Sequence, residues 1–217
     1  MALSEGDARS GVTVARSLSV PRIWLALACV FFSAPLAANG TAEPSPTDLI
    51  EGLLSGRAPV GGPFELTDQT GHRRTDADFQ GKLVVLYFGY TYCPDVCPTE
   101  LQSISLALDK LGAAATTVQP LFITVDPERD TKDALAKYVT AFDPRFLGMY
   151  GDLEATRRVA KDFKIYFEKR KTGSSYSIDH SAQSYVIDPQ GRLRLLVRHD
   201  RISSDLPDDL KALLRGA

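Results

Sequence analysis

Two of the three cysteines, Cys93 and Cys97, stand four residues apart in the segment Cys-Pro-Asp-Val-Cys-Pro. They follow the strongly apolar run 83–89 and precede a segment with helical periodicity. Side chains at this spacing share one face of a regular helix, with Cβ atoms about 5–6 Å apart, whereas a relaxed disulfide needs about 3.8 Å. The pair therefore suits two sulfurs that hold one ion. A reversible disulfide becomes feasible if Cys93 lies in the loop before the helix.

A structural disulfide is the alternative use of such a pair, and it is common in exported proteins. The loop that it would close is short, so it would restrict the unfolded chain little. A helix N-terminus lowers the pKa of nearby thiols, and thiolates are the form that binds soft metals and attacks disulfides. The pattern thus favours a working dithiol. The third cysteine, Cys29, lies in an N-terminal apolar stretch, and we interpret it as an ordinary apolar residue.

Of the three histidines, His180 has the context of a ligand, because it stands shortly before the apolar run 185–187. A loop that enters a strand there would lie at the same sheet edge as the two cysteines. The neighbouring Asp179 could orient the imidazole or neutralise local charge, or it could serve as a turn or capping residue. We interpret His72 and His199 as surface or hydrogen-bonded residues.

Two thiolates and one imidazole form a three-coordinate set of ligands. Soft thiolates favour Cu(I), and imidazole suits both copper and zinc. A structural zinc site needs a fourth protein ligand, and the sequence offers no obvious one near Cys93, Cys97 and His180. The donor set therefore favours copper.

The rest of the chain alternates between strand-like and helix-like segments, which favours an α/β fold with a central sheet covered on both faces. A right-handed β-α-β crossover places the cysteine loop at the carboxyl end of a central strand, where such sheets keep their sites. Asp126 and Asp130 follow another strand on that side, where they could contact a partner or cap the loop.

The basic run 169–171 is interpreted as a solvated loop. We predict a hairpin over 64–74, strands over 83–90, 118–125, 146–150, 184–187 and 192–197, and helices over 99–111, 131–142, 153–163 and 204–214.

The N-terminal region has the pattern of an exported protein. Residues 1–22 are polar, residues 23–42 carry no charge and read as an export signal or an uncleaved membrane anchor, and residues 43–60 read as a linker to a domain over 61–217. This organisation predicts a bacterial periplasmic protein, soluble or tethered to the inner membrane through the apolar segment. Acidic residues in the first ten positions favour this over mitochondrial import. The net charge of −2 argues against a nucleic-acid partner.

Three segments of the chain resemble the Sco/SenC proteins. Residues 87–99, Tyr-Phe-Gly-Tyr-Thr-Tyr-Cys-Pro-Asp-Val-Cys-Pro-Thr, resemble the signature segment of that family. Residues 125–131, Val-Asp-Pro-Glu-Arg-Asp-Thr, resemble a second segment, and residues 179–191 resemble a third. The similarity runs over roughly residues 61–215, with the segments in the order and at the spacing of the family.

The resemblance implies a thioredoxin-like fold, with three layers, a central mixed sheet, an N-terminal β-hairpin and flanking helices. It also implies a copper metallochaperone, not an enzyme, that serves the dinuclear copper site of cytochrome c oxidase subunit II during assembly. The metal ligands carried over are Cys93, Cys97 and His180, and Asp179 matches the acidic neighbour of the family histidine. The implied partners are subunit II or another copper chaperone.

Three other functions use the same residues. A thiol–disulfide oxidoreductase would reduce the cysteines of the oxidase subunit before the metal is loaded, although such enzymes more often carry a C-x-x-C pair. A thiol peroxidase would turn over peroxide. A copper or redox sensor would bind a regulatory partner, for which the sequence marks no surface.

Overall fold

The computed structural model describes residues 60–216, which form an α/β fold built on a seven-stranded mixed sheet. The strand order is β2-β1-β5-β4-β3-β8-β9, with β3, β4 and β5 parallel to one another. The strands are β1 (Glu65–Asp68), β2 (Arg73–Thr75), β3 (Leu83–Gly89), β4 (Val118–Thr124), β5 (Leu147–Tyr150), β8 (Gln183–Ile187) and β9 (Leu193–Arg198), and a separate two-stranded sheet contains β6 (Phe167–Thr172) and β7 (Ser175–His180).

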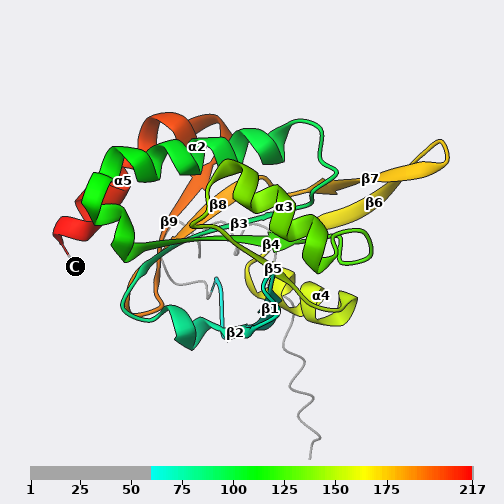
Figure 1. Cartoon of the computed structure of the whole chain (residues 1–217), viewed down its shortest axis with the longest axis horizontal. Helices are drawn as coiled ribbons and strands as arrows, with labels where there is room; N and C mark the ends of the chain where they lie inside the picture. Colours follow the sequence, from blue (N-terminus) through cyan, green and yellow to red (C-terminus); the bar gives the residue numbers. More distant parts are fainter. Residues whose placement is uncertain (1–59, 217) are drawn as a thin grey trace, which may run out of the picture. The chain divides into compact units, whose positions relative to one another are not determined.

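Helices cover both faces of the large sheet (Figure 1). The crossovers β3-α2-β4 and β4-α3-β5 step in the same direction, so their right-handedness places α2 (Val96–Leu111) and α3 (Lys132–Phe142) on one face. The C-terminal helix α5 (Ile202–Arg215) packs beside α2, and α4 (Leu153–Asp162) lies on the opposite face. The sequence pattern predicted a hairpin and a central sheet covered on both faces, and the structure has the three-layer, thioredoxin-like arrangement that the family resemblance implied.

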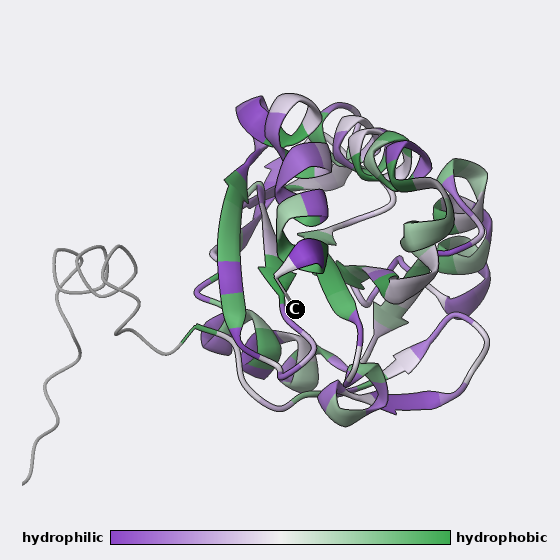
Figure 2. Ribbon diagram, turned by 90° about the vertical axis from the view of Figure 1, so that its left-hand side faces the viewer, coloured by the Kyte–Doolittle hydropathy of each residue, from purple (hydrophilic) through white to green (hydrophobic). Residues whose placement is uncertain are grey.

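The central strands are apolar because both of their faces are covered. All seven residues of β3 are buried, and β4 has one partly exposed residue. In Figure 2 the strands at the centre of the fold are hydrophobic, whereas the surrounding helices carry hydrophilic residues on their outer turns. The start of α3 is fixed by Thr131, whose hydroxyl accepts a hydrogen bond from the Ala134 N–H at 3.2 Å.

The prediction that the basic run 169–171 lies in a solvated loop is wrong, because these residues lie within β6 of the β6–β7 hairpin. Five of the six β6 residues are exposed, so the strand lacks the alternation of apolar residues by which a half-buried strand is recognised. Backbone pairing with β7 and cross-strand pairs such as Arg170 with Asp179 hold it instead. The hairpin projects beyond the large sheet (Figure 1). His180 consequently ends a strand, where the sequence predicted a loop.

The predicted export or anchor segment, residues 23–42, lies outside the described residues, together with the polar N-terminal region and the linker up to residue 59. Within residues 60–216, no helix has the length and apolar character required to cross a membrane.

Candidate metal centre

The two cysteines lie on either side of the start of α2, at the carboxyl end of the central strand β3. Cys97 occupies the first turn of the helix, whereas Cys93 lies in the preceding turn, where its N–H donates to the Tyr90 carbonyl at 3.2 Å. Both are free thiols. Cys93 therefore lies in the loop before the helix, the position that makes a reversible disulfide between the two feasible.

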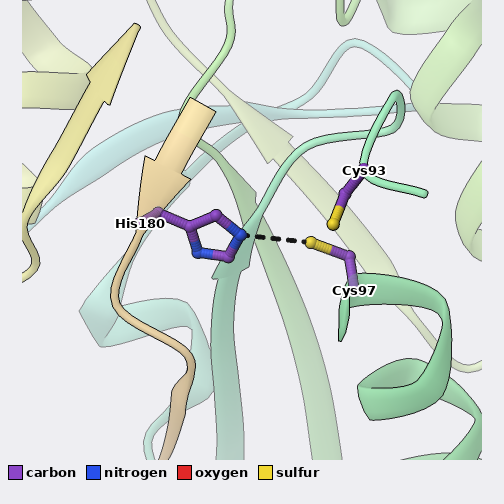
Figure 3. A group of neighbouring side chains, drawn as sticks. All are labelled: Cys93, Cys97 and His180. Atoms are coloured by element: carbon purple, nitrogen blue, oxygen red, sulfur yellow. Dashed lines mark hydrogen bonds between the residues drawn. The ribbon is translucent and has the colours of Figure 1, made fainter. Parts of the chain in front are cut away.

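His180 meets the two cysteines from the end of β7 (Figure 3). Its Nε2 lies 3.4 Å from Cys97 Sγ, and the three ligand atoms of Cys93, Cys97 and His180 all lie within 4.8 Å of one another. The three residues predicted from the sequence to share a metal ion are therefore brought together. Cys97 and His180, 83 positions apart, meet because β7 leads into β8, which pairs with β3, and the cysteines follow the end of β3.

The tautomer of His180 follows from its second ring nitrogen. Nδ1 lies 2.9 Å from the carbonyl oxygen of Ser181, which can only accept a hydrogen bond, so Nδ1 carries the proton. Nε2 then carries a lone pair that is directed at the cysteines, as a metal ligand requires. The imidazole is bordered by Tyr87 and Tyr90, with ring centroids 6.2 and 5.8 Å away in edge-on arrangements.

Asp179, which the sequence suggested as a partner of the imidazole, does not contact His180 through its side chain. Successive side chains on a strand point to opposite faces, so Asp179 is turned away from His180. Its carboxylate is exposed and accepts a hydrogen bond from Nε of Arg170 at 2.9 Å. The group that orients the imidazole in this structure is the Ser181 carbonyl, a backbone atom that residue type could not reveal.

The two thiols shift each other's pKa in opposite directions. The hydrogen bond from Cys97 lowers the pKa of Cys93 to about 3, outweighing burial, which opposes ionisation. The same hydrogen bond, with burial, raises the pKa of Cys97 above its ordinary value. Cys97 is fully buried and also receives a hydrogen bond from the Tyr87 hydroxyl at 3.7 Å. Cys93 is therefore the thiolate of the metal-free pair, and Cys97 releases its proton when a metal binds.

Gly89 makes room for the buried sulfur. A Cβ at this position would lie 2.8 Å from Cys97 Sγ and 2.8 Å from the Phe122 ring, closer than carbon atoms approach one another in proteins. The backbone of β3 thus passes directly against Cys97 because residue 89 has no side chain. Residue-by-residue reasoning about ligands missed Gly89, although a glycine that ends an apolar strand next to a site indicates such an approach.

Asp126 and Asp130 are both buried, so they hold loops and do not contact a partner directly. Asp130 accepts hydrogen bonds from the Thr91 N–H at 3.0 Å, the Thr91 hydroxyl at 2.6 Å and the Thr124 hydroxyl at 2.6 Å. These bonds fasten the turn that leads to Cys93 onto the end of β4. Burial raises the pKa of Asp130, against the lowering effect of these hydrogen bonds.

Arg129 ties the hairpin to the same loop. Its Nε donates to Asp126 at 2.5 Å, and its Nη1 donates to the Tyr176 carbonyl in β7 at 2.9 Å. The Tyr176 hydroxyl in turn donates to Asp126 at 2.8 Å, and the guanidinium carbon lies 3.7 Å from the centre of the Tyr176 ring. Since Tyr176 and His180 belong to one strand, this contact fixes the imidazole relative to the cysteines.

The other two histidines have the roles predicted for them. His72 is exposed in the β1–β2 turn, with Nδ1 2.7 Å from the Thr70 hydroxyl. His199 is partly buried, with Nδ1 2.7 Å from the buried carboxylate of Glu100. Neither contributes an atom to the cysteine–histidine group.

Comparisons with known proteins agree with this geometry. A family model described as SCO1/SenC matches residues 54–215. The human protein "SCO1 homolog, mitochondrial" is 41% identical over 140 residues, covering 63% of this chain and 46% of that protein. The zebrafish (Danio rerio) "SCO2 homolog, mitochondrial" is 45% identical over 135 residues, covering 60% and 48% respectively. The chain thus spans about half the length of these relatives.

The solved structures that are similar to this chain include members of the same family. The Bradyrhizobium japonicum ScoI structure with copper bound is 41% identical, with a TM-score of 0.67, and the match covers 71% of this chain and 99% of that one. The Arabidopsis thaliana ScoI structure with copper bound is 36% identical, with a TM-score of 0.69, and covers 73% and 99%. With its two cysteines and one histidine converging at the end of β3, and with a family match over most of its length, this chain belongs to the SCO1/SenC family.

Proposed function

We propose that this protein is a copper metallochaperone, which binds one copper ion through Cys93 Sγ, Cys97 Sγ and His180 Nε2 and delivers it to the dinuclear copper site of cytochrome c oxidase subunit II. The observation that carries the proposal is the convergence of these three atoms within 4.8 Å. Relatives that are 36% and 41% identical have been solved with copper bound, which supports the choice of metal.

The donor set fits copper better than zinc. Two sulfurs and one imidazole nitrogen are soft or borderline ligands, which suit Cu(I). A structural zinc ion would need a fourth protein ligand, and the described residues place no further histidine, cysteine or carboxylate in the group. Copper is the cargo of this site, and a three-coordinate set leaves a side open through which an acceptor ligand can approach.

Release begins on the side of Cys93. Cys97 is fully buried beneath the site, whereas Cys93 and His180 are partly exposed. An incoming thiolate of the acceptor therefore bonds to copper beside Cys93, and the Cys93–copper bond breaks first. Copper keeps its valence in this exchange.

Metal analysis tests the binding step. Copper and zinc are offered in competition to the reduced, purified protein. We expect one copper per chain and little zinc, because thiolate-rich three-coordinate sites select the softer ion. Preferential loading of zinc, or copper well below one ion per chain, would contradict the proposal.

A thiol–disulfide oxidoreductase that reduces the cysteines of subunit II is the second candidate. It is favoured by the low pKa of Cys93, its position outside the helix and the buried partner thiol behind it. Copper-free protein would then reduce an oxidised acceptor, and His180→Ala would retain this activity. Under the metallochaperone proposal, His180 is required and copper must be present.

The proposal extends to the location, which the polar-then-apolar N-terminal pattern supports, and to the partners, which the copper-delivery role supplies. The acceptor is subunit II or another copper chaperone, and the site acts in the bacterial periplasm, with the apolar segment 23–42 as a cleaved signal or a membrane tether. The N-terminal mass of the exported protein distinguishes a cleaved signal from a retained tether.

Arg129→Lys is expected to lower copper affinity by about 10–100-fold, the usual cost of losing a group that orients a metal ligand. Lysine cannot donate to both Asp126 and the Tyr176 carbonyl in the fork geometry of arginine, so β7 and its His180 lose their anchor. Competition with a copper chelator measures the affinity. Arg170→Lys, on the exposed face of the same hairpin, is the matched control and should bind copper as the wild type does. Equal affinities of the Arg129 and Arg170 variants would exclude this positioning role.

A further inference from the structure

Tyr92 is a large apolar side chain in solvent, beside a metal ligand. It is 62% exposed and directly precedes Cys93. Pro94 on the other side of Cys93 is exposed, and Val96 is partly exposed. Among the described residues, the other exposed large hydrophobic side chains are Leu106, Tyr166 and Leu196, and Tyr92 is more exposed than any of them. Exposed apolar surface beside a functional site is typical of a protein–protein contact.

The Tyr92 ring packs against the guanidinium group of Arg129. The guanidinium carbon of Arg129 lies 4.7 Å from the ring centre, and Arg129 is itself held by Asp126 and Tyr176. A cation–π contact of this kind keeps an exposed aromatic ring in one place. Little conformational freedom then remains to be lost when a partner covers the ring, which is the property that makes tyrosine and arginine frequent in the energetic centres of interfaces.

We propose that the Tyr92 surface, defined as Tyr92, Pro94 and Val96, docks the protein that accepts copper. This inference rests on the proposed function. During ligand exchange an acceptor thiolate bonds to copper as the Cys93–copper bond breaks, and Cys93 leaves as a thiolate. Both sulfurs are bound to one ion at that moment, so the acceptor surface must lie against the residues that flank Cys93. The partner is thus a protein with its own copper-binding thiols, bordered by apolar surface.

A matched pair of tyrosine variants tests the docking surface. Tyr166 is 55% exposed and belongs to the same neighbourhood, because its carbonyl accepts a hydrogen bond from the Ser181 N–H at 3.0 Å. The Tyr166 hydroxyl donates to Glu168 and accepts from Arg170 Nη2 at 3.5 Å, so its side chain lies on the face of the hairpin that carries the Arg170–Asp179 pair, away from the metal ligands. Tyr92→Ala and Tyr166→Ala therefore remove the same group at similar exposure, one beside the site and one behind it.

The experiment follows copper transfer by stopped flow. Copper-loaded wild type and both variants are mixed with the copper-free copper-site domain of subunit II and, separately, with bathocuproine disulfonate, a small chelator that needs no docking surface. We expect Tyr92→Ala to transfer copper to the protein acceptor about 10-fold more slowly or worse, as for an interface residue of large effect. Tyr166→Ala should stay within about twofold of wild type, and all three proteins should lose copper to the chelator at equal rates.

The remaining outcomes distinguish failure of the proposed docking surface from failure of the proposed copper delivery. Wild-type transfer rates in Tyr92→Ala overturn the docking surface, and so does a change in its transfer to the chelator, since that would locate the effect in the metal site. Complex formation is measured in parallel by calorimetry with copper-free proteins. If wild type binds the acceptor but passes no copper, delivery fails, and loss of the complex in Tyr92→Ala then upholds the surface. If wild type forms no complex, the docking surface is overturned.

Discussion

Replacing His180 by alanine is expected to lower the affinity for copper by more than about 100-fold, because the loss of groups that merely orient a ligand already costs about 10–100-fold. The imidazole supplies the only nitrogen donor that residues 60–216 place at the site, and its Nε2 is aimed at the cysteines by the Ser181 carbonyl. Affinity is measured by competition with a chelator of known strength under reducing conditions.

The controls separate loss of a ligand from loss of the fold. His72→Ala, at an exposed turn away from the site, should bind copper as wild type does. His180→Ala should retain two titratable thiols and the thermal stability of the metal-free wild type within a few degrees, since its side chain is at the rim of the core. Unchanged copper affinity in His180→Ala would remove the imidazole from the coordination set and leave the dithiol chemistry as the better account.

Gly89→Ala is expected to destabilise the protein by about 1–3 kcal/mol, the usual cost of adding a methyl group to a packed core. For a domain of this size that corresponds to a fall in melting temperature of about 2–4 °C per kcal/mol. The added Cβ would meet Cys97 Sγ and the Phe122 ring, each at 2.8 Å. Relief of this clash must displace Cys97 from the other two ligands, so copper affinity should fall together with stability.

Gly62→Ala is the matched control for this variant. A Cβ there would meet only atoms 3.9 Å away, which is ordinary contact, and its backbone is not in the left-handed region. Differential scanning calorimetry with and without copper measures both effects. If Gly89→Ala melts and binds copper as Gly62→Ala does, the close approach of β3 to Cys97 is not a constraint on the site.

Much of the fold could be predicted because local pattern and tertiary environment agree there. The run over 83–89 is apolar at every position, as a strand covered on both faces must be, and β3 occupies those residues. Thr131 offers a cap directly before a helical period, and it is the cap of α3. The hairpin of β6 and β7 could not be predicted in this way, since its strands are held by each other's backbones while the side chains of β6 face solvent.

The candidate site divides along the same line. The sequence by itself determined its chemistry, because two cysteines four residues apart and one histidine in a strand-entering context limit the donor atoms to sulfur and nitrogen, which select a soft metal. Only the tertiary structure decided which groups support those donors. Asp179 pairs with Arg170, the Ser181 carbonyl orients His180, and Arg129 joins the hairpin to the loop beside the cysteines. Residue types determine the reactivity of a site. Contacts between segments that are distant in the sequence depend on which segments become neighbours, and the packing of the whole domain decides this.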